Sequence, residues 1–66
     1  PMWRSSVKVG DLIKDKHYPD RLAVIVEINS EDEGLHCLVH ALDGSGYHWI
    51  TKEMLYENCE ALNANW

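Results

Sequence analysis

The sequence predicts an all-β domain in which five short strands close into a small barrel and one short helical turn precedes the last strand. Short apolar runs rich in Val, Ile and Leu are separated by clusters of Gly, Pro, Asp and Asn, a pattern typical of strands and turns. The 66 residues, 45% of them hydrophobic, suffice for one small folded domain. Because five short strands would otherwise leave open edges, we expect closure into a barrel.

The chain divides into a flexible lead-in at 1–6, a barrel at 7–62 and a tail at 63–66. A chain of this length buries only about 60% of the surface that its unfolded form exposes. A deep internal active site is therefore not expected unless subunits combine.

The first strand is expected to follow Gly10 and Asp11, a pair that breaks an apolar run as a sharp bend at a barrel edge requires. Pro19 and Asp20 predict a turn, because proline presets a turn dihedral and aspartate accepts backbone hydrogen bonds. Residues 22–28, LAVIVEI, form the clearest strand of the chain. Their nearly continuous apolar run indicates a bent strand that serves different sides of the barrel.

The middle of the chain predicts two hairpins. The polar and acidic residues 29–34 are expected to form a loop, and 35–42 the next strand. Residues 43–46 contain an Asp-Gly pair that favours a tight turn, and 47–51 form the return strand.

The last elements are a single helical turn and a short strand. The hydroxyl of Thr51 can cap a helical turn over 52–58. Asn58 tolerates the left-handed conformation in which such a turn ends, and 59–62 form the final strand.

Four stretches carry a resemblance: VGDLI at 9–13, LAVIVEI at 22–28, LVHALDGSGYHWI at 38–50 and EMLYENCEAL at 53–62. They resemble the SH3-like small β-barrels, and in particular the uncharacterised short barrels of tailed phages and mobile gene cassettes. Ala23 departs from this pattern, which prefers glycine there. The resemblance implies an SH3-like barrel whose core contains Ala23, Ile25 and Ile28, completed by Leu12, Leu38, Ile50 and Leu55.

The chain is acidic, with 11 acidic and 6 basic residues and a net charge of -5. Residues 1–21 carry five bases and three acids, for +2, whereas 22–66 carry one base and eight acids, for -7. This balance disfavours general nucleic-acid binding, which depends on Lys and Arg at phosphates. A local basic face remains an alternative; its residues would be Lys8, Lys14, Lys16 and Arg21, with Tyr18 as a stacking platform.

Cys37 and Cys59 are too few for a disulfide scaffold, and their separation matches no zinc-ligand spacing. We expect two free thiols that act as small hydrophobes. Cys37 cannot pair with the adjacent His36 for catalysis, since neighbours on a strand point to opposite faces. With no signal-peptide run and no membrane span, the expected location is the cytoplasm of the host cell, or the virion if the protein is phage-encoded.

The four histidines are the most reactive residue type of the chain, and the register of the hairpin decides which of them meet. A two-residue loop would set His48 beside Ala41 and on the opposite face from His40. A bulged three-residue loop would make His40 and His48 neighbours, with His36 on the same face, a geometry that allows zinc or nickel. The sequence specifies no further ligand nearby, so we expect no metal and no other cofactor.

The aromatic residues are all Trp or Tyr, the types that combine large apolar area with a polar tip. In one interpretation Trp49 and Tyr56 lie half in the core. In the other, Tyr18, Tyr47 and Trp49 form a groove for a peptide or a second subunit. The candidate binding residues are therefore Tyr18, Tyr47, Trp49, His40 and His48.

From these observations we expect a non-enzymatic interaction module of phage or mobile-element origin, acting as a homo-oligomer that covers its apolar strand edges. An enzymatic alternative is suggested by the type II dihydrofolate reductases, which are SH3-like barrels with a shared central pore. Their pore motif, Val-Gln-Ile-Tyr, is absent here, and fold alone does not transfer function.

Overall fold

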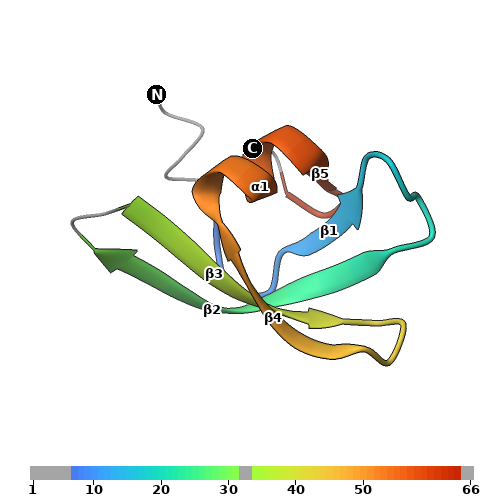
Figure 1. The fold of residues 1–66 in the computed structure, drawn as a ribbon, viewed down its shortest axis with the longest axis horizontal. Coiled ribbons are helices and arrows are strands. Elements are labelled where there is room, and N and C mark those ends of the chain that lie inside the picture. The colour runs from blue at the N-terminus through green and yellow to red at the C-terminus, as the bar shows by residue number, and fades with distance from the viewer. Residues whose placement is uncertain (1–6, 32–33, 65–66) are drawn as a thin grey trace.

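The computed structural model describes residues 7–31 and 34–64 (Figure 1). The predicted lead-in at 1–6, the centre of the predicted acidic loop at 32–33 and the last two residues of the predicted tail lie outside the described residues. The described part confirms the all-β class and the helical segment before the last strand. Its elements are β1 (Leu12–Asp15), β2 (Leu22–Glu31), β3 (Gly34–Ala41), β4 (Gly46–Thr51), α1 (Lys52–Asn58) and β5 (Cys59–Ala61).

The five strands form one antiparallel sheet in the order β4-β3-β2-β1-β5 (Figure 1). Strands β4 and β5 are the two edges of this sheet and do not pair with each other within the described chain. The predicted closure into a barrel is therefore not completed by backbone pairing. The seam between β4 and β5 stays open.

Strand β2 is the longest of the sheet, and it bends at a β-bulge. It pairs with β1 through residues 22–24 and with β3 over most of its length. Ile25 lies opposite Val39 and Glu27 opposite Leu38, so Val26 is the extra residue. This bulge supplies the predicted bend, and it puts Ile25 and Ile28, three residues apart, on the same face.

Pairing of β2 with β3 continues to Glu31 opposite Gly34. The prediction of a loop over 29–34 was therefore wrong at its start. Asn29 and Ser30 are exposed and polar, but backbone pairing does not require apolar side chains.

The β3–β4 hairpin has a longer connection than expected. Ala41 lies opposite Gly46, which leaves the four residues 42–45 as the connection. Gly44 and Gly46 both have positive φ, at 90° and 97°, so these glycines permit the turn. Neither of the two registers considered from the sequence is present.

The chain enters β1 through a turn held by Asp11, as the Gly10-Asp11 pair predicted. Gly10 has φ of 97°, and the Asp11 side chain accepts a 2.8 Å hydrogen bond from the Lys8 amide. The Gly10 amide donates to the Ile25 carbonyl at 2.8 Å. At the other end of β1, the Arg21 amide donates to the Tyr18 carbonyl at 2.8 Å, which confirms the predicted Pro-Asp turn.

Helix α1 begins as predicted and ends differently. The Thr51 hydroxyl accepts a hydrogen bond from the Met54 amide at 3.3 Å, which confirms the cap. No described residue other than glycine has positive φ, so the left-handed conformation predicted for Asn58 was wrong. The chain instead becomes extended at Cys59, and the Asn58 carbonyl accepts from the Lys16 amide at 2.7 Å.

The core lies between α1 and one face of the sheet, which we call the inner face. Leu55 of α1 and Ile25 and Cys37 of the sheet are fully buried. The predictions for Ala23, Ile25, Ile28, Ile50 and Leu55 are confirmed as core or as side chains packed against it.

Two core predictions were wrong. Leu12 lies opposite Val24 and Leu38 lies opposite Glu27, on the other face of the sheet, which we call the outer face. Ile13 and Val39 take their places in the core. Neighbouring residues of a strand point to opposite faces, so an error of one position exchanges core for surface.

Candidate functional site

The outer face of β2, β3 and β4 carries a group of apolar and aromatic side chains that are exposed or half-buried. Tyr47 is 63% exposed, Trp49 53% and Val26 37%. We call this group the outer aromatic patch; its residues are Val24, Val26, Leu38, His40, Tyr47 and Trp49. Such a cluster on one face of a small domain marks a candidate interaction surface.

Strand register assembles the patch. Val24, His40 and Tyr47 form one row across the three strands. Glu27, Leu38 and Trp49 form the next row. The His40 and Tyr47 rings stack with their centroids 4.7 Å apart and their planes 18° apart, so this part of the patch is already ordered.

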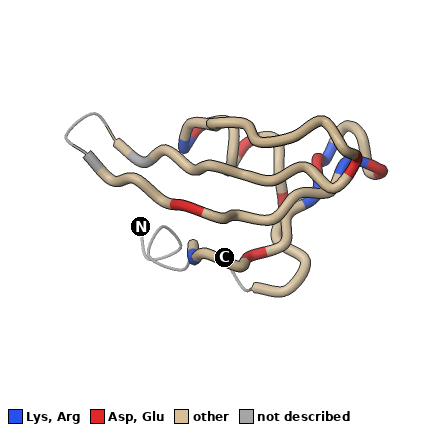
Figure 2. Tube along the Cα trace, turned by 90° about the horizontal axis from the view of Figure 1, so that it is seen from below, with Lys and Arg blue, Asp and Glu red and all other residues tan. Residues whose placement is uncertain are grey.

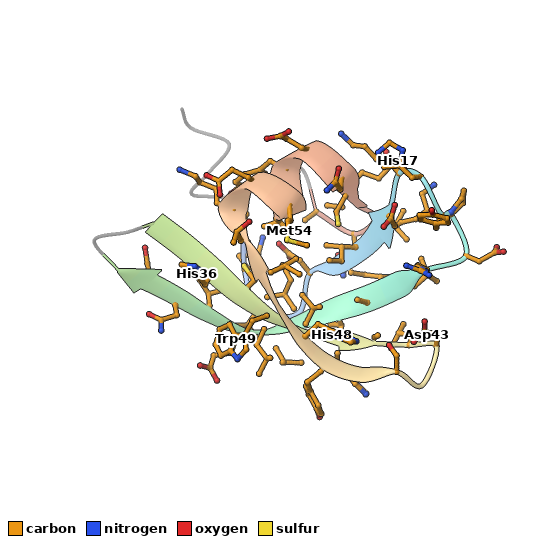
Figure 3. The ribbon with its side chains drawn as sticks, in the orientation of Figure 1. His17, His36, Asp43, His48, Trp49 and Met54 are labelled. Atoms are coloured by element: carbon orange, nitrogen blue, oxygen red, sulfur yellow. The ribbon has the colours of Figure 1, made fainter. Side chains whose placement is uncertain are left out.

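Trp49 belongs to this surface and not to the core, and Figure 3 shows it on the side of the sheet away from Met54. Tyr56 is half-buried and packs against the core. The interpretation that places aromatic residues partly in the core is therefore confirmed for Tyr56 but not for Trp49, which is 53% exposed.

Tyr18 does not join the outer aromatic patch. It lies in the β1–β2 loop, 58% exposed, and the Arg21 guanidinium sits 4.7 Å from the centre of its ring. No ring contact between Tyr18 and Tyr47 or Trp49 occurs among the described residues. The groove predicted from these three aromatics is therefore divided between two places.

His48 also lies away from the patch, because its position is opposite Val39, on the inner side of the sheet. Its Nε2 atom lies 3.0 Å from the Ser45 hydroxyl. The Asp43 carboxylate accepts a 2.9 Å hydrogen bond from the Ser45 amide. Hydrogen bonding from Ser45, with the charge of Arg21, holds the pKa of Asp43 below its ordinary value. Since Asp43 bonds Ser45 and not the imidazole among the described contacts, these residues do not form a Ser-His-Asp triad.

The histidines do not cluster. His40 faces Tyr47, His48 lies beside Val39, and His36 is opposite Thr51. Figure 3 shows His36, His48 and His17 at separate places on the fold. Among the described residues, no group of three or more His, Cys, Asp and Glu side chains could hold a metal ion.

The basic residues that the structure describes do not form one face. Lys14 makes a 2.9 Å ion pair with Glu60, and Arg21 is stacked on Tyr18. Figure 2 shows basic and acidic residues interspersed at the end of the molecule that carries the β1–β2 loop. Within residues 7–31 and 34–64, this arrangement gives the nucleic-acid alternative no continuous positive surface.

Both cysteines are free thiols. Burial raises the pKa of Cys37 to about 11. The pKa of Cys59 is also raised, by burial and then by the charge of Asp15. Neither thiol has the lowered pKa of a nucleophile.

In the described part of the chain, the seven-residue α1 is the only helix, and it is too short to cross a membrane.

A second feature, a pocket of about 540 Å³ on the inner side of the sheet, was not predicted from the sequence. Its apolar wall includes Ile13, Ala23, Val39, Ile50, Met54 and Cys59. Its charged and polar rim consists of Asp15, Arg21, Asp43, Ser45 and His48. The pocket is built from all five strands and the helix, so only the assembled sheet reveals it.

No protein family model, no curated protein and no solved structure matches this chain. The resemblance to short phage and cassette barrels stays a prediction from the sequence.

Proposed function

We propose that this chain is a non-enzymatic interaction module that associates with a second copy of itself through the outer aromatic patch. The supporting observation is the exposure of Tyr47 and Trp49 beside the stacked His40 on one face of the sheet. Tyr and Trp supply most of the binding energy at many protein interfaces, because each buries a large area at low entropy cost.

Charge favours a second copy as the partner. Three cross-strand rows hold the outer aromatic patch and its border, and Glu27 is the single formally charged residue in them; the rows are Val24-His40-Tyr47, Glu27-Leu38-Trp49 and Asn29-His36-Thr51. The chain as a whole carries -5. Two copies that meet at these nearly neutral rows keep most of their negative charge apart.

Size favours association as well. A stable interface buries about 800 Å² on each partner. That area is roughly a fifth of the 4476 Å² accessible surface of this chain. Six neighbouring apolar and aromatic side chains on one face form the central part of such a surface. Burial there adds apolar contacts that a domain of this size lacks in its own core.

Sedimentation velocity over a range of concentrations tests the proposal. We expect the double variant Tyr47→Ser, Trp49→Ser to weaken self-association at least tenfold, because loss of two aromatic contacts at an interface costs roughly 2 kcal/mol or more. The matched control is Tyr18→Ser, which removes a similarly exposed tyrosine outside the patch. Equal association of the wild type and the double variant would contradict the proposal.

A further inference from the structure

The open seam between β4 and β5 contains a second site, which adjoins the outer aromatic patch and shares only Trp49 with it. We propose that the inner pocket and the free edge of β4 together bind an extended, apolar peptide segment that ends in a basic residue. The segment would add as a strand to β4 and fill the seam of the sheet.

The pocket lies between the edge of β4 and the strands β1 and β5. Asp15, at the end of β1, and Cys59, at the start of β5, line one side. The opposite side includes His48, Trp49 and Ile50 of β4. Since neighbouring residues on a strand point to opposite faces, this run of three shows that the pocket reaches the edge of β4.

Strand β4 has a free backbone edge within the described chain. This strand pairs only with β3 within the described chain. Along an edge strand, alternate amide and carbonyl groups point away from the sheet and can pair with an added strand. The combination of such an edge with an apolar cavity suits an extended peptide, because backbone pairing supplies affinity and the cavity accepts alternate side chains.

The charged side chains at the rim of the pocket favour a basic ligand. The rim carries two carboxylates, Asp15 and Asp43, against one guanidinium, that of Arg21. Arg21 is stacked on Tyr18 and makes no ion pair with the described residues. Asp43 is fully exposed, and hydrogen bonding from Ser45 favours its charged form. The rim therefore carries a net negative charge. This charge favours a Lys or Arg at the point where the bound segment passes the β3–β4 hairpin.

The test uses a capped seven-residue peptide of three valines alternating with two serines, with a lysine at each end. Placing lysine at both ends presents a basic residue to Asp43 in either strand direction. One control peptide has glutamate in place of both lysines. A second has N-methyl groups on both serines, which removes two backbone donors.

We expect saturable binding of the lysine peptide in fluorescence anisotropy and clearly weaker binding of both control peptides. Asp43→Asn should weaken binding of the lysine peptide about three- to fivefold, the range of an exposed ion pair. Ala41→Leu, which fills the pocket, should weaken it about tenfold or more. Val9 is exposed and does not line the pocket, so the control variant Val9→Ser should leave binding of the lysine peptide unchanged.

Amide hydrogen exchange of the wild type keeps the test independent of how the variants fold. The lysine peptide should slow exchange of amides in β4. Absence of saturable binding, equal binding of the glutamate peptide, or binding without protection of β4 would overturn the proposal. Protection of β4 that rises with protein concentration alone would assign the edge to a second copy and would also overturn it.

Discussion

Asp11 shows how a single residue fixes the start of the sheet. The residue is only 3% exposed, and its carboxylate accepts a hydrogen bond from the Lys8 amide. Its carbonyl accepts from the Ile25 amide at 3.0 Å, which ties the turn to β2. The sequence identified the bend here but not the burial of the acid.

We predict that Asp11→Ala lowers the free energy of unfolding by about 1–3 kcal/mol, because a charge-assisted hydrogen bond is lost and the Lys8 amide loses its acceptor. Asp11→Asn, which keeps one side-chain oxygen, should cost less. Urea unfolding followed by tryptophan fluorescence measures both. Equal stability of Asp11→Ala and the wild type would show that this turn does not depend on the carboxylate.

The lowered pKa of Asp43 predicts that the stability of the fold depends on pH in the acidic range. Its pKa in the folded chain lies below its ordinary value because of Ser45 and then Arg21. A lowered folded-state pKa stabilises the fold above the unfolded-state pKa, about 3.9, and this contribution is lost as pH falls through the folded-state value.

The Tm of the wild type should therefore exceed that of Asp43→Asn at neutral pH by a small margin that shrinks below about pH 4. Thermal unfolding of both proteins between pH 7 and pH 2 measures this margin. A margin that stays constant or grows in acid would show that Asp43 does not stabilise the fold through its charge.

At the scale of elements, local sequence signals located every strand and the helix but did not determine their register. Gly and Asp pairs marked the turns, and Thr51 marked the start of α1. The bulge at Val26 and the four-residue hairpin connection depend on pairing between strands. These two features decide which side chains face outward, so Leu38 was placed in the core by mistake and the inner pocket was not predicted.

Helix α1 depends on its cap, because seven residues are too few to form a stable helix alone. We predict that Thr51→Ala lowers the free energy of unfolding by about 0.5–2 kcal/mol, through loss of the bond to the Met54 amide. Thr51→Ser retains a hydroxyl and should keep most of that stability. Chemical denaturation of the two variants makes the comparison, and an equal loss in both would mean that the methyl group matters and the cap does not.

At the scale of the whole molecule, the two faces of the sheet have different roles. The inner face holds the core under α1 and the pocket at the open seam. The outer face presents the outer aromatic patch, with little charge, on a chain that is otherwise acidic. A domain of this size with such a surface gains stability when a second copy covers it.

The most direct test of this account is the mass of the wild-type chain in solution. Light scattering on the purified protein, over concentrations from micromolar to millimolar, should give at least twice the 7.6 kDa of one chain at the upper end. The mass should return toward 7.6 kDa in the variant Tyr47→Ser, Trp49→Ser. A wild-type mass of 7.6 kDa at every concentration would contradict self-association through the outer aromatic patch.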